Sequence, residues 1–275
     1  MSAPRPPEVI IRSAQHPAVK EARRLEADAG ARRKEGRAVA WGRHLAIEAL
    51  AAGIPIERAF LAPGVEDDAE GERLAAAIAR AAVPALRVAK ALLDGIAAGA
   101  GDQGIVLVLR RPSMTLDDLL ARRPTLLLLA HGVQDPGNLG SMIRSARALG
   151  ADAMGVLEGS ADPWSSRALR AAMGAAFHLP IVEAKSGPLL AALRRAGLRV
   201  VAAASAATTA PAGADLRGPV ALLLGREGAG LPPALLDAAD ATVGIPMQPE
   251  VDSLNVHAAA AILLYEARRQ RDARP

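Results

Sequence analysis

Short, predominantly apolar runs recur through the C-terminal half of the chain and constrain its fold more than any other feature. Most are separated by stretches in which apolar residues recur at helical spacing. Strands that are apolar along their whole length are buried on both faces, as in a parallel sheet covered by helices on both sides. We therefore predict an α/β fold with parallel strands at 125–130, 153–157, 178–182, 199–203, 220–224 and 242–245.

The N-terminal half predicts a smaller α/β unit. Helices are expected at 44–52, 69–82 and 90–96, and strands at 58–61, 85–88 and 104–109. A chain of 275 residues fits two modest domains. Pro112 and Pro124 bracket a short helical stretch at 114–121, which suggests a boundary. We predict an N-terminal domain at 1–112, a linker at 113–124 and a C-terminal domain at 125–275.

The composition excludes several classes of protein. The chain has no cysteine, which rules out disulfides, a thiolate nucleophile and a cysteine zinc site. No apolar run approaches the roughly 18 to 20 residues of a membrane span, and the first 25 residues lack the apolar core of a signal peptide. We expect a soluble, cytoplasmic protein.

The charge favours an acidic partner, because the formal net charge is +4 and the pI is about 10.1. Nine basic residues and four acids lie between Arg12 and Arg43. This segment is either an arm that follows phosphates or a solvated charged helix, and the sequence leaves both open. The chain holds five aromatic residues, too few to favour a sheet that stacks bases on a row of aromatic rings.

Because parallel sheets bind ligands at the carboxyl ends of their strands, the loops after Ala130, Leu224 and Ile245 are the candidates for a functional site. In the first loop, Asn138 stands near a predicted helix start, where asparagine can cap the helix. The helical spacing of the apolar residues that follow turns Arg144 away from the core.

The second loop places Gly225, Glu227, Gly228 and Gly230 directly after the most hydrophobic run. Glycines let the backbone approach a ligand closely or adopt positive φ. The order G-x-x-G-x-G is not the dinucleotide fingerprint, and no G-K-[ST] occurs in the chain. An ordinary glycine-rich turn remains an alternative at this point.

The third segment runs from the last predicted strand through a proline-containing loop into a helix, with Ser253 as the candidate N-cap. Packing explains Leu254 and Val256. It does not require Ser253, Asn255 and His257 to lie so close together.

Taken together, the three segments resemble the signature motifs of the SpoU (TrmH-like) family of SPOUT RNA methyltransferases in order and spacing. The matches are N-x-G-x-x-x-R at Asn138, Gly140 and Arg144; G-x-E-G-x-G at Gly225, Glu227, Gly228 and Gly230; and I-P-M with S-L-N-V at 245–247 and 253–256. The ordered set over about 120 residues is highly specific. The stretches SAQHPAVKEARRL, GRHLAIEALAAG and DQGIVLVL resemble the family's N-terminal RNA-binding domain.

The resemblance implies a C-terminal domain with a deep trefoil knot and a ribosomal-protein-like α/β fold in the N-terminal domain. It implies 2′-O-ribose methylation of a structured RNA by a homodimer, with S-adenosylmethionine as cofactor. Ribosomal RNA is the expected substrate and transfer RNA the alternative.

The resemblance also assigns residues. Asn138, Ser253 and Asn255 are expected to orient the ribose or Arg144, the family's catalytic arginine. Because a guanidinium stays protonated at neutral pH and is therefore a poor base, we expect Arg144 to clamp a phosphate and lower the pKa of the hydroxyl. Glu227 is expected either to anchor Asn138 or Arg144, or to close its own loop. The residues expected to line the cofactor site are Gly225, Gly230, Ile245, Met247 and Leu254.

Two residues depart from the family pattern. Trp41 stands where relatives often have an acid, and His257 where a small residue is usual. The alternatives to an RNA methyltransferase are a non-catalytic RNA-binding protein and a nucleotide-dependent dehydrogenase. Metal binding is not expected, since His131, His178 and His257 form no helical i,i+4 pair.

Overall fold

The computed structural model describes residues 9–97 and 103–273, and their contacts divide the chain into two units. The first unit comprises the described residues up to Pro112 together with Trp164–Arg170, and the second comprises Ser113–Pro163 and the residues from Ala171 onwards. Residues 113–124 contain a helix, α6 (Leu116–Ala121), and cluster with the second unit. No helix within the described ranges is long and apolar enough to cross a membrane.

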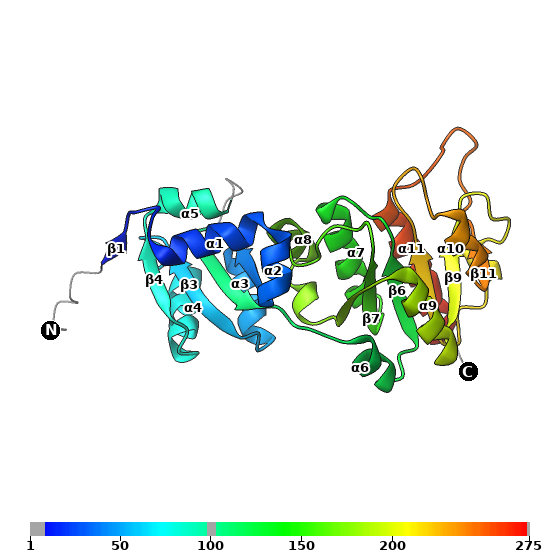
Figure 1. Ribbon diagram of the computed structural model, residues 1–275, viewed down its shortest axis with the longest axis horizontal. Coiled ribbons are helices and arrows are strands. Elements are labelled where there is room, and N and C mark those ends of the chain that lie inside the picture. The colour runs from blue at the N-terminus through cyan, green and yellow to red at the C-terminus, as the bar shows by residue number, and fades with distance from the viewer. Residues whose placement is uncertain (1–8, 98–102, 274–275) are drawn as a thin grey trace. The chain divides into compact units, whose positions relative to one another are not determined.

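The first unit has a mixed five-stranded sheet in the order β1-β4-β3-β5-β2, in which β5 is antiparallel to both of its neighbours (Figure 1). Helices α1, α2 and α5 pack against one face, where Phe60 and Trp41 lie in the core, while α3 and α4 contact each other. The elements are β1 (Ile10–Ile11), α1 (Pro17–Ala27), α2 (Ala29–Glu35), β2 (Arg37–Trp41), α3 (Arg43–Ala51), β3 (Ile56–Leu61), α4 (Ala69–Arg80), β4 (Ala85–Val88), α5 (Lys90–Ile96) and β5 (Ile105–Arg110).

The basic N-terminal segment folds into α1, α2 and β2. One face of α1 is buried in the core through Val19, Ala22 and Leu25, which explains why this charged segment is helical. The sequence did not predict β2, because its five residues lie directly after a run of charged residues. The segment is therefore helical over α1 and α2, and its role as an arm that follows phosphates stays a prediction.

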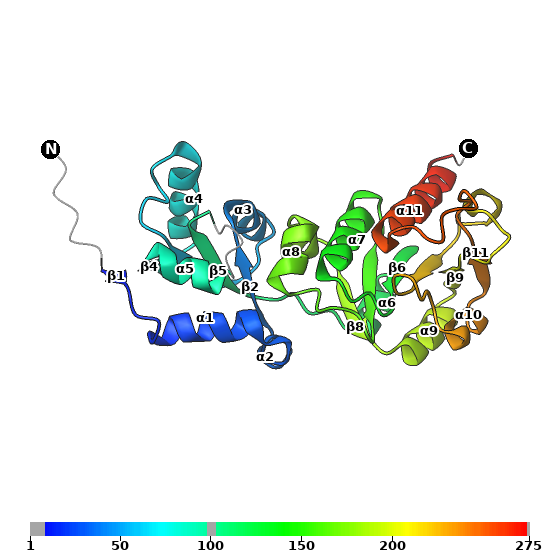
Figure 2. The ribbon, with the colours of Figure 1, turned by 90° about the horizontal axis from the view of Figure 1, so that it is seen from above.

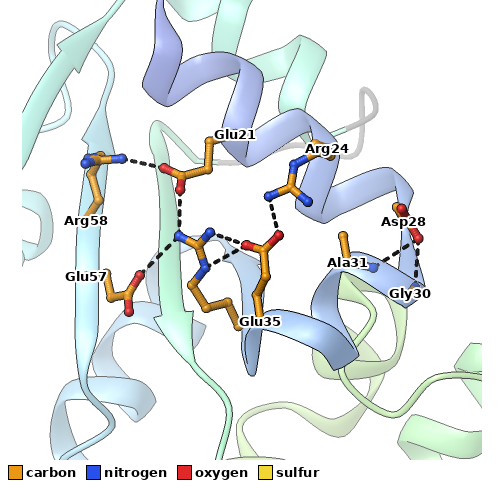
Figure 3. A network of polar contacts seen from close by, with 9 residues as sticks. Glu21, Arg24, Asp28, Gly30, Ala31, Glu35, Glu57 and Arg58 are labelled. Carbon is orange, nitrogen blue, oxygen red and sulfur yellow. Dashed lines mark hydrogen bonds and ion pairs between the residues drawn. The ribbon is translucent and has the colours of Figure 1, made fainter.

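Many of the charges in this segment are used in a network centred on Arg37, which contacts Glu21, Glu35 and Glu57 (Figure 3). Arg58 also pairs with Glu21, at 2.7 Å. Partial burial works against ionisation of Glu21, but the hydrogen bonds and charges of Arg37 and Arg58 outweigh it and lower the pKa of this carboxyl. The network joins α1 to β2 and β3 through groups distant in sequence, which is why spacing along the helix did not reveal it.

The second unit contains a six-stranded sheet in the order β11-β9-β10-β6-β7-β8, with every pair parallel. Its strands and 3-10 turns are β6 (Leu126–Ala130), β7 (Ala153–Leu157), η1 (Ala175–Phe177), β8 (Ile181–Ala184), β9 (Arg199–Ala203), η2 (Pro211–Gly213), β10 (Val220–Leu224) and β11 (Ala241–Val243). The predicted α/β class and parallel sheet are confirmed. The strand predicted at 178–182 begins later, because η1 and Pro180 occupy the preceding residues.

Helices cover both faces of this sheet (Figure 2). One face packs apolar side chains from α6, α9 and α10, and the other face lies against α7 and α11, which also pack on each other. The remaining helices are α7 (Pro136–Ala148), α8 (Ser166–Ala172), α9 (Ser186–Arg195), α10 (Pro233–Asp237) and α11 (Val256–Asp272). The predicted trefoil knot stays a prediction.

The last two turns of α11 are held by polar side chains. Glu266 accepts hydrogen bonds from Arg269 and Gln270, both at 2.8 Å, and Gln270 accepts the Leu216 amide at 2.9 Å. These bonds, with the charge of Arg269, lower the pKa of Glu266 to about 2 from an ordinary value of 4.5. The carboxylate thus contributes stability above pH 4.5 that is lost as the pH falls toward 2.

We expect Glu266→Gln to lower the free energy of unfolding by about 1 to 2 kcal/mol at pH 7, because it replaces the carboxylate that accepts charge-assisted bonds from Arg269 with a neutral amide. The difference from the wild type should shrink as the pH falls from 4.5 toward 2, since the wild-type carboxylate is then protonated. Urea titrations at several pH values measure this. Asp272→Asn is the control, since Asp272 pairs with Arg268 at the exposed end of the same helix. A difference that is constant with pH contradicts the prediction.

Candidate functional site

The three candidate loops follow β6, β10 and β11 at the carboxyl edge of the parallel sheet, where β10 lies between β6 and β9. Backbone bonds join the first two loops at their base, since the His131 amide donates to the Leu224 carbonyl at 2.9 Å. The sheet order thus brings together segments that are about 90 to 120 residues apart in the sequence.

The first loop enters α7 earlier than predicted. The helix begins at Pro136, and its N-cap is Asp135, whose Oδ1 accepts the Asn138 amide at 2.8 Å. The prediction that Asn138 caps the helix is therefore wrong. Because Asp135 satisfies the first-turn amide, the side chain of Asn138 is available for bonds outside its own helix.

The side chain of Asn138 connects the other two loops. Its Nδ2 donates to Glu227 Oε1 at 2.8 Å, and its Oδ1 accepts Asn255 Nδ2 at 3.0 Å. An ionised carboxylate can only accept hydrogen bonds, so the Nδ2 of Asn138 has to face Glu227 and its Oδ1 has to face Asn255. Asn255 must then present its own Nδ2 to Asn138. The Oδ1 of Asn255 then accepts the His257 amide at 2.8 Å. The side chains of Asn138 and Asn255 thus each have one partner for their oxygen and one for their nitrogen.

Of the two roles that the sequence left open for Glu227, the side chain takes the first and anchors Asn138. The loop is closed by backbone bonds, since Arg226 and Gly230 exchange two of them at 3.0 and 2.8 Å.

The third segment enters α11 later than predicted. Asn255 is the N-cap, because its side chain accepts the His257 amide, so the prediction of Ser253 as the cap is wrong. Ser253 is exposed two residues before the cap. The ring of His257, one of the two departures from the family pattern, lies 3.1 Å from Ser145 Oγ and thereby joins α11 to α7.

A cavity of about 260 Å³ lies beside this row of hydrogen bonds. All five residues predicted to bind a cofactor line it, and so do Glu227 and Ser253, whereas Asn138, Asn255 and Arg144 are not among its lining residues. The sequence missed two parts of the wall, namely Asp252 and residues 203–206. The second could have been found, because it follows β9, the neighbour of β10 in the sheet.

One wall of the cavity requires glycine. A Cβ on Gly225 would lie 2.2 Å from the carbonyl carbon of Gly230, so a side chain cannot fit where the loop folds back on itself. Gly228 and Gly230 have φ of +73° and +66°, a region that side chains disfavour. Leu224, Leu231 and Val243 supply apolar surface beside this backbone. Such a cavity suits a ligand with a flat apolar part and polar edges.

Arg144 lies on the outer face of α7 and is exposed, as predicted, while Leu139, Met142 and Ile143 are buried. No side chain within residues 9–97 and 103–273 forms a hydrogen bond or ion pair with its guanidinium. Within the same residues, no group of three or more histidine and acidic side chains is arranged to hold a metal ion.

Two family models match the chain. Residues 125–265 match the SpoU rRNA Methylase family, and residues 39–115 match the family described as RNA 2′-O ribose methyltransferase substrate binding.

Individual relatives agree with these matches. An uncharacterized tRNA/rRNA methyltransferase of Synechocystis is 33% identical over 95% of this chain and 94% of its own. The Bacillus subtilis 23S rRNA (guanosine(2553)-2′-O)-methyltransferase RlmP is 39% identical over 52% of this chain and 57% of its own. The crystal structure of an AdoMet-bound rRNA methyltransferase from Sinorhizobium meliloti, 32% identical, superposes with a TM-score of 0.81 and covers 95% of this chain and 97% of its own.

We expect Gly225→Ala to lower the free energy of unfolding by about 1 to 3 kcal/mol, because the new methyl group has to displace backbone. Gly218→Ala is the matched control, since a Cβ there meets no atom within 4 Å. Denaturant unfolding of both variants provides the comparison. If the Gly225→Ala and Gly218→Ala variants were equally stable, the loop would accommodate the methyl group without loss of stability, and the prediction would be wrong.

Proposed function

The chain belongs to the SpoU rRNA methylase family, and on that premise we propose that it methylates the 2′-hydroxyl of a ribose in ribosomal RNA. The membership confirms the resemblance of the three motifs. The protein is an RNA methyltransferase, and its methyl donor is S-adenosylmethionine. The dehydrogenase and the non-catalytic module are thereby set aside.

The observation that most supports the proposal is the row of hydrogen bonds from Glu227 through Asn138 to Asn255, which joins all three motifs beside the glycine-walled cavity. Motif residues that served only packing would not need matched polar partners at a partly exposed edge of the sheet. We infer that the row holds ribose-binding groups in one orientation.

The cavity fits the cofactor on the grounds of its own residues. Leu224, Val243 and Ile245 supply apolar walls for an adenine ring, and the turn at Gly225 brings backbone close enough to contact its polar edges. When bound, S-adenosylmethionine supplies a sulfonium methyl group that is open to in-line displacement by an oxygen. Glu227 and Asp252 are the carboxylates in the cavity wall, and both suit a cationic ligand.

The residues of the chain then have two tasks, namely to hold the hydroxyl about 3 Å from the methyl carbon and to help it lose its proton. We assign the orientation of the ribose to Asn138, Asn255 and Ser253, and the hydrogen bond between the first two supports this assignment. Arg144, which has no protein partner among the described residues, binds the target phosphate and lowers the pKa of the neighbouring hydroxyl by its charge. The proton leaves through the phosphate or water.

Two observations support ribose rather than base as the methylated group. The substrate-binding family model at residues 39–115 is defined on RNA 2′-O ribose methyltransferases, and RlmP of Bacillus subtilis is named as such an enzyme on 23S rRNA. The absence of cysteine also excludes a mechanism in which a thiolate adds to a base.

The direct test is to incubate the protein with labelled S-adenosylmethionine and unmodified ribosomal and transfer RNAs, and then to map 2′-O-methyl sites. We expect incorporation at a ribose of ribosomal RNA. Incorporation into transfer RNA alone would overturn the substrate, and incorporation into no RNA would overturn the proposed function.

We expect Arg144→Ala to lower kcat by about 100-fold or more, since it removes charge stabilisation from the reacting group. Arg144→Lys should also be strongly impaired, because an ammonium cannot form the bidentate clamp. pH–rate profiles of both variants and the wild type measure this. Arg147→Ala, an exposed arginine on the same helix, is the control. Wild-type turnover in Arg144→Lys would exclude the bidentate clamp.

We also propose that the enzyme is a homodimer that associates through α11. Ile262 and Tyr265, one turn apart on this helix, are 39% and 59% exposed and together give this helix an exposed apolar surface. Ile262→Glu is expected to produce a monomer with little activity. Sedimentation velocity tests this, with Val9→Glu as a control at an exposed apolar residue of the first unit. A monomeric wild type would contradict the proposal.

A further inference from the structure

Arg226 is an arginine in the second motif for which the reaction described above has no use. It lines the cavity between Gly225 and Glu227, and its side chain is exposed. None of the described residues makes a hydrogen bond or ion pair with its guanidinium. Glu227, the carboxylate next to it in the sequence, accepts the side-chain amide of Asn138 at 2.8 Å and forms no ion pair with Arg226.

The backbone of Arg226 is held firmly although its side chain is exposed. It exchanges two hydrogen bonds with Gly230, at 3.0 and 2.8 Å. Its Cβ lies 3.5 Å from where a Cβ on Gly132 would be, so the stem of the side chain starts where the loops after β6 and β10 touch. A long cationic side chain therefore begins from a fixed point on the rim of the cavity.

Arg226 forms no ion pair with either of the two carboxylates in the cavity wall, so its charge is open to an external anion. Arg226, Glu227 and Asp252 are the charged residues among those that line the cavity, and Glu227 is engaged with Asn138. Asn138 lies in the first turn of α7, and Arg144 lies six residues further along this helix, or about 9 Å along its axis. The guanidinium groups of Arg144, on α7, and of Arg226, in the β10 loop, thus both lack a partner among the described side chains.

We propose that Arg226 binds a backbone phosphate of the RNA next to the one held by Arg144 and so positions the strand over the cavity. This inference rests on the proposed function. A guanidinium matches the oxygens of a phosphate with two parallel hydrogen bonds, and binding would supply the partner that the protein does not. The carboxylate of the cofactor is the competing anion. The apolar interior and the outward exposure of the side chain favour the RNA.

The test uses an RNA that the wild type methylates and compares Arg226→Ala and Arg226→Lys with the unaltered enzyme. For Arg226→Ala we expect a roughly tenfold rise in the KM for RNA, with kcat at saturating RNA unchanged. The slope of log affinity against log salt concentration should decrease in magnitude by roughly 0.7 to 0.9, which is the contribution of one phosphate contact. Arg226→Lys should restore the salt slope, since it keeps the charge.

Arg195→Ala is the matched control. Arg195 is an exposed arginine at the end of α9, a helix that runs back to the opposite edge of the sheet, and it has no partner among the described residues. It should leave both the KM and the salt slope unchanged. Calorimetry with S-adenosylmethionine and with 5′-methylthioadenosine shows whether Arg226 binds the RNA phosphate or the carboxylate of the cofactor. Methylthioadenosine lacks the amino acid part, so its affinity does not depend on a contact with that carboxylate.

Three results would overturn the inference. Arg226→Ala could leave RNA affinity and salt slope at wild-type values. It could instead weaken S-adenosylmethionine but not methylthioadenosine, which would assign Arg226 to the cofactor carboxylate. A wild type that methylates no RNA would overturn the proposed function as well, so failure of the inference alone is recognised by an active wild type.

Discussion

The hydrogen bonds that Asn138 forms with Glu227 and Asn255 are the interactions on which the geometry of the site depends. They join side chains that are 89 and 117 residues apart in the sequence, and each amide has one orientation that satisfies both neighbours. Loss of one partner leaves a partly buried amide or carboxylate unsatisfied, which costs more than the net value of a single bond. The three loops are thus fixed relative to one another by polar groups, while the sheet beneath them is fixed by apolar packing.

This separation of tasks explains how much the sequence could predict. Strands buried on both faces consist of apolar runs, so 153–157, 199–203 and 220–224 were predicted with the bounds that β7, β9 and β10 have. The position of the loops follows, because the strands of a parallel sheet present their carboxyl ends at one edge. The family motifs supplied what these patterns could not, since an exposed arginine such as Arg144 has no distinctive spacing.

The helix caps were the part that local sequence could not decide. Asp135 and Asn138 are both good N-caps and lie three residues apart, as Ser253 and Asn255 lie two apart. The choice depends on which side chain finds a better partner elsewhere. Glu227 provides one for Asn138, so Asp135 caps α7. At the start of α11, Asn255 makes both kinds of bond, since its Oδ1 caps the helix by accepting the His257 amide and its Nδ2 donates to Asn138. Strand β2 was missed for a related reason, because its partner β5 lies more than 60 residues further along the chain.

The arginines show how one residue type stabilises the fold in one unit and, in the function that we propose, binds RNA in the other. Arg37 is largely buried, with an exposed side-chain fraction of 18%, and a buried guanidinium needs carboxylates nearby to offset its desolvation. Arg144 and Arg226 remain hydrated, so they need no protein partner, and a surface ion pair would add at most about 1 kcal/mol of stability. Leaving them unpaired therefore costs the fold little. It keeps both charges available to the RNA phosphates that we propose as their ligands.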